Sequence, residues 1–454
     1  MKITLPLLAA VGLASAAKSG VTMERLMNMK LSQREEYRSQ GYFDSGKYNG
    51  NNRINKCRDG RAGEYKCDNV DMHGFLSHEE MGSSTREGND IWGWTSPDGR
   101  EFGAIGQTDG TAFVEVKKNG RLEYKGRLPT QTYPISWRDM KVIDGYVYIG
   151  SEAEGHGLQV FDMRKLLRLR KPREFSIHED MTAWFDGFGS SHNIVAHEET
   201  NMIYAVGTQR NLSCAGGLYM VDVSDPSKPT SPGCAADDGY VHDAQCVIYV
   251  GPDTKYLNRE ICFNYNEDTL TIVDVTDKKA PKIISKTDYV GAAYTHQGWV
   301  TNDKWMTHLL LDDELDEVEQ AGHAANNHTT TYVFDIQSLD KPFNTGYYQS
   351  PVKSIDHNQY VINNFTYQAN YASGLRVVDI SSYAQHPDGS KFEQAGFFDC
   401  HPEDDDNGVV KFVGSWGVYP YFKSGYILLN SIERGVYSLK FNDRPGRRFP
   451  SLSD

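Results

Sequence analysis

The stretches Met220-Val-Asp-Val223 and Ile272-Val-Asp-Val275 decide the fold, because each is an alternating apolar strand end that the chain repeats. Seven copies of this pattern recur at intervals of 44 to 61 residues. The other five copies are residues 113–116, 159–162, 333–336, 377–380 and 437–440. A recurrence of this period is typical of propellers and solenoids, in which about 40–50 residues suffice for a four-stranded blade. We therefore predict an all-β fold, a seven-bladed β-propeller.

Only three strands of the seventh blade are visible before the chain ends in the tail 444–454. An unpaired sheet edge is unfavourable, and ring closure abolishes it. We therefore expect residues 70–76 to supply the missing strand. The propeller is then predicted over residues 69–443, with the two ends of the chain paired.

Residues 1–16 have the pattern of a secretory signal peptide. Lys2 is followed by an apolar run at residues 3–13 and by the small-residue site Ala14-Ser15-Ala16, which is the order such peptides show. We expect cleavage after Ala16, with Ala17 as the alternative position. A membrane anchor is the other interpretation, but the run is too short to span a bilayer. The sequence thus predicts a secreted, extracellular protein without a membrane span.

Residues 17–68 are predicted to form an N-terminal extension of the propeller. Leu26, Met27 and the stretch 29–31 are spaced loosely as in a helix. Residues 46–68 are rich in Asn, Gly and Arg, so we expect irregular structure there. The extension is therefore predicted to be a short helix followed by a loop.

The chain is acidic, with a formal net charge of -14 at pH 7. Nucleic acids and anionic membrane surfaces both select basic patches in the proteins that bind them. The charge therefore disfavours both as partners. The expected partner is an extracellular ligand or a component of the cell surface.

The seven cysteines of a secreted chain predict disulfides. Residues equidistant from a turn face each other in an antiparallel hairpin, closely enough to form a bridge. By this argument Cys214 pairs with Cys234, and Cys246 with Cys262. Cys57 and Cys67 are predicted to close a small loop in the N-terminal segment. Cys400 is left over, either as a reactive thiol beside His401 or as an unreactive side chain of an outer strand. A cysteine metal site is disfavoured because the sequence has no C-x-x-C pair.

Three sequons are predicted as glycosylation sites, because such sequences in a secreted protein accept glycans on surface loops. Their asparagines are Asn211, Asn327 and Asn364.

Polar residues recur at the start of successive blades. In a propeller the first strand of each blade lines the central channel, so residues at this position converge on the axis. The residues with ligand chemistry are His192, His242, His296, His357, Asp139, Asp243 and Asp356. Neutral imidazoles with carboxylates suit a transition metal, and the same groups suit acid–base catalysis. The third interpretation is a ring of hydrogen bonds between blades, since buried polar groups must be paired.

A run of acidic residues predicts a possible calcium site, because oxygen-rich loops suit Ca²⁺. The run consists of Asp312, Asp313, Glu314, Asp316 and Glu317. It lacks the EF-hand pattern, and a solvated loop is the alternative. The sequence also has no G-x-S-x-G, H-E-x-x-H or G-x-x-x-x-G-K motif, which disfavours a serine hydrolase, a zincin or a nucleotide enzyme.

Several longer stretches resemble the choice-of-anchor B family of extracellular proteins with LVIVD-type propeller repeats. They are Asn89-Asp-Ile-Trp-Gly-Trp94, Ser136-Trp-Arg-Asp139, His156-Gly-Leu-Gln-Val-Phe-Asp162, Gly239-Tyr-Val-His-Asp-Ala-Gln-Cys246, Tyr294-Thr-His-Gln-Gly-Trp299 and Asp312-Asp-Glu-Leu-Asp-Glu317. The resemblance covers about residues 69–441 and implies a secreted β-propeller, but it implies no reaction. This chain lacks the C-terminal sorting anchor of the bacterial members.

The leading hypothesis is therefore a secreted, glycosylated propeller that works as a binding or scaffold module. The alternative is a metal-dependent enzyme with a His and Asp site in the axial channel. A third interpretation is a hydrolase or lyase of extracellular polysaccharide, since Trp and Tyr at the blade openings could stack on sugars.

Overall fold

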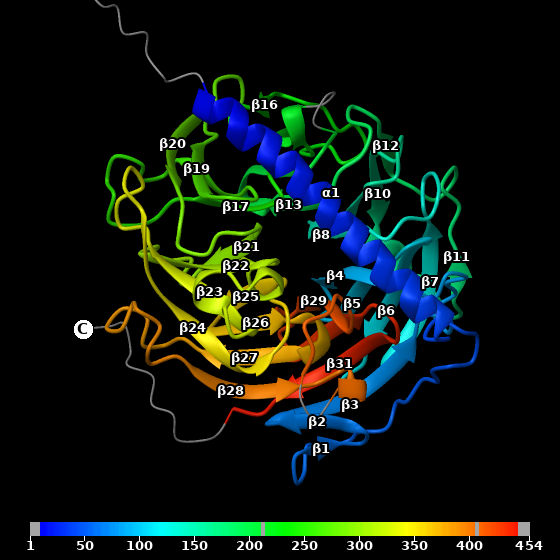
Figure 1. Ribbon diagram of the computed structural model, residues 1–454. Helices are drawn as coiled ribbons and strands as arrows, with labels where there is room; N and C mark the ends of the chain where they lie inside the picture. Colours follow the sequence, from blue (N-terminus) through cyan, green and yellow to red (C-terminus); the bar gives the residue numbers. More distant parts are fainter. Residues whose placement is uncertain (1–9, 210–213, 405–407, 444–454) are drawn as a thin grey trace, which may run out of the picture.

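The predicted repeats form seven antiparallel sheets arranged as blades in a closed ring (Figure 1). The computed structural model of the protein describes residues 10–209, 214–404 and 408–443, with side chains described from Met23 onward. The first strands of the blades contact one another around the axis. The prediction of a seven-bladed β-propeller is confirmed.

Each blade has four strands that follow one another outward from the channel. Blades 1 to 3 comprise β4 (Gly88–Thr95), β5 (Glu101–Gln107), β6 (Gly110–Val116), β7 (Leu122–Pro129); β8 (Arg138–Ile143), β9 (Tyr146–Ser151), β10 (Leu158–Asp162), β12 (Ala183–Phe185); and β13 (Asn193–His197), β14 (Met202–Val206), β15 (Leu218–Asp222), β16 (Cys234–Ala235). Blades 4 and 5 comprise β17 (Asp243–Ile248), β18 (Glu260–Tyr265), β19 (Leu270–Asp274), β20 (Lys282–Thr287); and β21 (Thr295–Val300), β22 (His308–Asp313), β23 (His328–Asp335), β24 (Phe343–Lys353). Blades 6 and 7 comprise β25 (Gln359–Ile362), β26 (Phe365–Ala369), β27 (Leu375–Asp379), β28 (Glu393–Phe398); and β29 (Ser415–Tyr419), β30 (Tyr426–Ser431), β31 (Gly435–Phe441), β3 (Val70–Ser77).

The remaining elements decorate the ring. β11 (Arg173–Glu174) pairs with β7, and β1 (Arg61–Ala62) and β2 (Tyr65–Asp68) extend blade 6 beyond β28. The residues predicted to be irregular thus contain two short strands, because the outer edge of blade 6 offers β2 a partner. The short helices are α2 (Asp316–Glu319), η1 (Met163–Arg168), η2 (Glu198–Thr200), η3 (Cys214–Gly216), η4 (Gly322–Ala324), η5 (Tyr371–Ser373) and η6 (Pro402–Asp404).

The repeated strand end has a physical role in the third strands of blades 2 to 6. Its apolar residues are buried, and its Asp turns the chain toward the fourth strand. Asp274 Oδ1 accepts a hydrogen bond from the backbone N–H of Thr276, two residues further on, at 3.0 Å. The same i to i+2 bond recurs at Asp162, Asp222, Asp335 and Asp379. This Asx turn is a known local use of Asp, and it explains the recurrence of an acid in an apolar strand.

The ring is closed by strands from the two ends of the propeller. β3 pairs antiparallel with β31, and the register places Val70 opposite Phe441 and Ser77 opposite Gly435. Phe75 packs on Tyr437, with ring centroids 4.7 Å apart. The expectation that residues 70–76 complete the seventh blade is confirmed.

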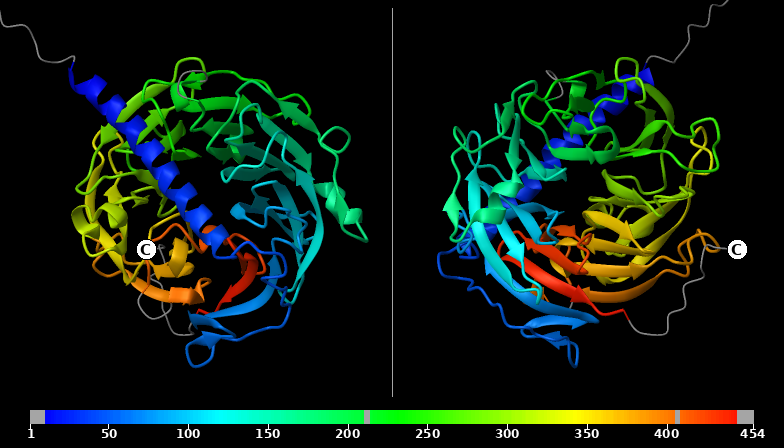
Figure 2. Two further views of the ribbon diagram at one scale, coloured as in Figure 1. Left: turned by 45° about the vertical axis from the view of Figure 1, so that its right-hand side comes forward. Right: turned by 180° about the vertical axis from the view of Figure 1, so that it is seen from behind.

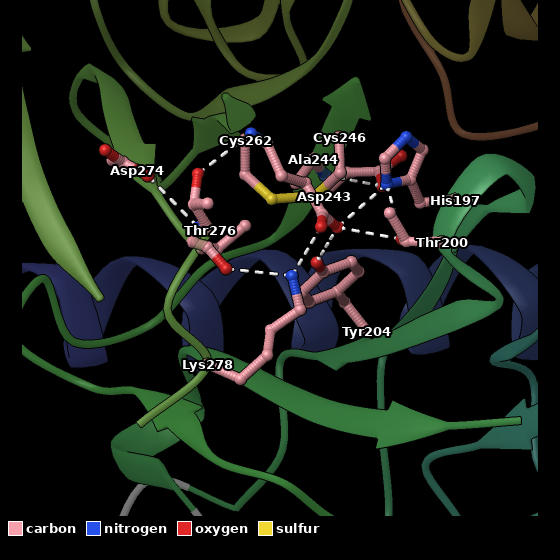
Figure 3. Close-up of a disulfide and its surroundings, with 12 residues drawn as sticks. His197, Thr200, Tyr204, Asp243, Ala244, Cys246, Cys262, Asp274, Thr276 and Lys278 are labelled. Atoms are coloured by element: carbon pink, nitrogen blue, oxygen red, sulfur yellow. Dashed lines mark hydrogen bonds and ion pairs between the residues drawn. A yellow bond between two sulfur atoms is a disulfide. The ribbon is translucent and has the colours of Figure 1, made fainter. Parts of the chain in front are cut away.

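The three predicted disulfides are present, and they join Cys57 to Cys67, Cys214 to Cys234, and Cys246 to Cys262. The last pair faces across β17 and β18 in direct register (Figure 3). Cys400 is free and buried. Burial raises the pKa of its thiol well above the usual value, which disfavours the reactive thiolate.

The N-terminal helix α1 (Ala10–Ser39) crosses one mouth of the ring (Figures 1 and 2). It begins earlier than expected, inside the predicted signal peptide. The side chains that it buries follow helical spacing at Met23, Leu26, Lys30, Arg34 and Tyr37. None of the helices in the described residues is long and apolar enough to cross a membrane.

Candidate metal centre beneath the N-terminal helix

Four of the predicted histidines form an arc in the channel, on the side that α1 covers. They belong to consecutive blades, at or just before the first strands β13, β17, β21 and β25. The ring centroids of His192 and His242 are 4.4 Å apart, those of His242 and His296 4.2 Å, and those of His296 and His357 4.4 Å. All four side chains are buried. The structure thus brings together residues that lie in four separate blades.

Each imidazole is held by a hydrogen bond at its Nδ1 atom. His242 Nδ1 lies 2.7 Å from the carbonyl oxygen of His296, and His357 Nδ1 lies 2.5 Å from that of Trp416. Carboxylates hold the other two rings: His296 Nδ1 lies 2.8 Å from Asp312 Oδ1, and His192 Nδ1 lies 2.5 Å from Glu152 Oε1. An oxygen acceptor requires the N–H on Nδ1, so in a neutral ring the lone pair lies on Nε2.

This arrangement is typical of metal-binding histidine, which donates its other N–H to a carboxylate or a carbonyl. Burial lowers the pKa values of His242, His296 and His357 well below the usual range, and neighbouring histidines and Lys30 lower them further. These three rings are therefore neutral at physiological pH, as ligation requires.

Glu314, directly after β22, adds a carboxylate to the arc. Its Oε2 lies 4.0 Å from His296 Nε2, and its Oε1 lies 3.6 Å from His357 Nε2. Potential donor atoms of His242, His296 and Glu314 all lie within 4.8 Å of one another. His242 Nε2 and Glu314 Oε2 are buried without a hydrogen-bond partner. Among the described residues, this set alone brings three potential ligands so close together.

Two of the three predicted aspartates, Asp139 and Asp243, make contacts outside the histidine arc. Asp139 pairs with Lys141 at 2.7 Å and accepts a hydrogen bond from Ile194 N of the next blade at 2.7 Å. Asp243 accepts from Ala244 N at 2.7 Å. Adjacent strand residues point to opposite faces, so a residue that follows a channel histidine faces away from it. The metal interpretation thus loses these side chains as ligands.

The third interpretation, a ring of hydrogen bonds between blades, is also observed, at channel residues next to the histidine arc. Gln245 Oε1 accepts from Val300 N at 2.8 Å, and Gln297 Oε1 accepts from Gln359 N at 3.0 Å. Hydrogen bonds between blades thus occupy positions of these strands that alternate with the histidines, and metal binding by the histidines stays a prediction.

The acidic run is divided by the same alternation. Asp312 and Glu314 face the histidines, whereas Asp313, Asp316 and Glu317 lie on the other side. Asp313 accepts hydrogen bonds from Tyr294 N at 2.8 Å and from the Tyr289 hydroxyl at 2.7 Å. Calcium binding by the run stays a prediction, because its carboxylates form no equally close set in the described residues.

Asp356 belongs to this acidic group rather than to the histidine arc. Its backbone N–H lies 3.4 Å from Glu317 Oε2. Burial, together with the charge of Asp313, raises the pKa of Asp356 to about 8. Its side chain is therefore largely protonated at neutral pH.

Helix α1 places an ammonium group at the same carboxylate. Lys30 Nζ lies 2.6 Å from Glu314 Oε1, and the exposed fractions of the two side chains are 3% and 0%. The Tyr371 hydroxyl donates to the same oxygen at 2.5 Å. Sequence reasoning missed Lys30, although a lysine among Met23, Leu26 and Tyr37 at helical spacing was a visible irregularity.

The opposite mouth of the channel is an open cavity of about 1980 Å³. Trp92, Trp299 and Tyr360 line it, together with Asp243 and Lys141. Burial raises the pKa of Asp243 to about 7, against the opposing effect of Lys141. Aromatic side chains with a few polar groups are the usual lining of ligand sites.

Two of the three predicted glycosylation sites lie in the described residues. Asn327 Nδ2 donates to the carbonyl of Glu317 at 2.7 Å, and Asn364 lies in the turn between β25 and β26. Asn211 lies outside the described residues. Glycosylation at all three stays a prediction.

Comparison with known proteins adds one sequence match. Residues 214–234 match the LVIVD repeat. The LVIVD repeat contains β15, one of the seven alternating strand ends, and the bonded pair Cys214 and Cys234. The narrower choice-of-anchor B resemblance receives no further support, and no curated protein matches the chain.

Among solved structures, the chain matches the crystal structure of the Cps50 (Swd1) β-propeller domain of Myceliophteria thermophila. Its TM-score is 0.44 at 9% sequence identity, and the match covers 78% of this chain and 95% of that one.

Proposed function

We propose that this protein is a secreted, glycosylated binding propeller that holds a transition-metal ion in its axial channel. The observation that carries the metal is the convergence of His242, His296 and Glu314, with potential donor atoms within 4.8 Å of one another. Unpaired buried polar atoms are unfavourable, and a metal ion would satisfy both His242 Nε2 and Glu314 Oε2. His357 and His192 extend the donor set on either side.

The donor types favour a first-row transition metal. Imidazole suits zinc, copper, iron and nickel, whereas Mg²⁺ and Ca²⁺ prefer oxygen ligands. Two imidazoles and one carboxylate form a known set for zinc and for non-haem iron. We therefore expect zinc or ferrous iron rather than calcium at this position.

The test is elemental analysis of protein purified from culture medium without chelator. We expect about one equivalent of a transition metal in the natural protein and loss of that metal from His242→Ala/His296→Ala. The matched control is His323→Ala/His386→Ala, which removes two exposed histidines and should keep the metal. Absence of metal from the folded natural protein, even after incubation with Zn²⁺ and Fe²⁺, would contradict the proposal.

Binding is the better-supported role for the propeller as a whole. The open cavity at the mouth opposite α1 offers a ligand site lined by Trp92, Trp299 and Tyr360, and rigid blades with variable loops suit binding. Incubating an array of extracellular glycans and peptides with the purified protein, and measuring which of them capture it, tests this role. Trp92→Ala, compared with the exposed Trp184→Ala, should abolish capture of a true ligand.

A metal-dependent enzyme is the second candidate. Sets of two histidines and one carboxylate leave coordination positions open for water or substrate in known catalytic sites. Activity screens on the metal-loaded protein, with His242→Ala/His296→Ala as the blank, test this candidate. A turnover that persists in the double variant would exclude the channel as its source.

A further inference from the structure

We propose that α1 is a latch whose Lys30 ammonium pairs with Glu314, the carboxylate of the metal centre, so that metal binding and helix docking oppose each other. This inference rests on the proposed metal site and adds a means of regulating it.

The geometry brings the ammonium into direct competition with a metal ion. Lys30 Nζ is 2.6 Å from Glu314 Oε1, and His357 Nε2 is 3.6 Å from that same oxygen. A metal bound by Glu314 would therefore be a second cation beside a buried ammonium, in surroundings that screen charge poorly. Both cations draw on one carboxylate, so each weakens the binding of the other.

The docking face holds two buried cations, Lys30 and Arg34, among apolar side chains. Met23, Leu26 and Tyr37 lie on the same helix face and pack into one apolar cluster with residues of the ring. A buried ion pair is often no more stabilising than a well-packed apolar pair in the same place. Packing alone would therefore be served equally well by an apolar residue at position 30, and the lysine adds sensitivity to what Glu314 binds.

An aromatic enclosure holds the ammonium in place. Lys30 Nζ lies 5.2 Å from the ring centroid of Trp416, 5.5 Å from that of Phe412 and 5.9 Å from that of Tyr371. Aromatic faces at such distances attract a cation. Tyr371 also donates a hydrogen bond to Glu314. The aromatic rings and the carboxylate therefore surround the Lys30 ammonium together.

A second set of ion pairs holds the C-terminal part of α1 to the ring. Arg34 Nε lies 3.2 Å from Glu87 Oε1, and Arg38 Nη2 lies 2.8 Å from Glu87 Oε2. These contacts do not involve the histidine arc. They would keep the helix tethered when the Lys30 contact is lost, which makes release local and reversible.

The test measures Co²⁺ affinity, because bound Co²⁺ has visible absorption. We compare the full-length natural protein with Lys30→Met, which keeps the length of the side chain and removes its charge. Couplings between sites are typically 5–150-fold, and we expect Lys30→Met to lower the Kd for Co²⁺ at least about tenfold within that range. The control Arg25→Met changes an exposed cation of the same helix that pairs with Glu319, and its Kd should equal that of the natural protein. Equal Kd values for Lys30→Met and the natural protein would overturn the latch.

A second measurement needs no variant, which protects the test if Lys30→Met fails to fold. Amide hydrogen exchange in residues 23–39 of the natural protein should accelerate when Co²⁺ is added, whereas exchange in β5 should stay unchanged. Unchanged exchange in residues 23–39 at saturating Co²⁺ would overturn the latch while leaving the metal site intact. If no folded variant binds Co²⁺, the metal site and the latch both fall.

Discussion

Lys30 and Glu314 form a fully buried ion pair between the N-terminal helix and the fifth blade, with 2.6 Å between Nζ and Oε1. The pair joins the extension to the ring at the one place where the described residues bring three potential metal ligands together. Glu314 therefore serves the docking of the helix and the metal centre at once.

Replacement of Glu314 by Gln should remove both properties. Lys30 would remain buried without its partner, and breaking a buried pair in this way typically costs about 3–5 kcal/mol of unfolding free energy. We expect a clear fall in Tm together with loss of bound metal.

The matched control is Glu319→Gln, which disrupts the more exposed pair with Arg25. Such surface pairs contribute about 0–1 kcal/mol, so its Tm should change little. If calorimetry gives the two variants the same Tm, the buried pair contributes no more to stability than the exposed pair does.

The free energy of unfolding should depend on pH through Glu260, which links the third and fourth blades. Burial alone would raise the pKa of this carboxyl, but hydrogen bonds from His197, Lys278 and Tyr204 outweigh burial and lower the pKa from 4.5 to about 2. A lowered folded-state pKa stabilises the fold above the unfolded value near 4.5, and this contribution is lost as the pH falls toward 2.

The measurement is chemical unfolding of the natural protein and Glu260→Gln at pH 7 and pH 3. We expect the variant to be less stable by about 2 kcal/mol at pH 7, after allowing for solvent screening. The difference should narrow at pH 3. Glu199→Gln, at an exposed position in the same region, should show no such dependence, and a gap of constant size would contradict the assignment.

Ring closure should depend on Phe75 of β3. Its side chain is buried against Tyr437, and truncation of a buried Phe to Ala typically costs about 3–5 kcal/mol. Phe75→Ala should therefore lower the Tm strongly, whereas Phe343→Ala, at a side chain with 53% exposure, should not. Comparable melting temperatures would mean that the β3–β31 pairing is not needed to hold the ring.

The disulfide between Cys246 and Cys262 should stabilise the fourth blade. It closes a loop with a sequence separation of 16 residues, for which a contribution of about 3 kcal/mol is typical. Cys246→Ala/Cys262→Ala should unfold at lower denaturant concentration than the natural protein. Cys400→Ala, which removes a buried thiol outside any bridge, should have a smaller effect.

Most of the fold was predictable because its determinants are local and repeated. The alternating apolar strand ends mark each blade, five of them with an Asp such as Asp274, and the visible lack of a last strand pointed to β3. Two of the three disulfides followed from symmetric spacing around turns, and the pair Cys57 and Cys67 from its short separation. The four channel histidines were found by the same argument of equivalent positions.

The rest of the site depends on contacts that no local pattern reveals. Glu314 lies in an acidic run whose members face two directions, so the run as a whole suggested calcium. Lys30 contacts Glu314 only because α1 crosses the mouth of the ring. The spacing of apolar residues in a helix does not reveal which distant surface the helix packs on. Asp243 does not join the histidine arc because strand alternation turns it away from His242, and Asp356 lies beside Glu317 instead.

The pairing of β3 with β31 also constrains how the protein is made. Synthesis makes β3 before β31, with six blades between them, so β3 must wait through the synthesis of those blades for its partner. Until then its open edge is available to other chains, which is a known route to misassembly. The ring can therefore close only after all seven blades have been made, and a chain that stops before β31 would keep the edge of β3 unpaired.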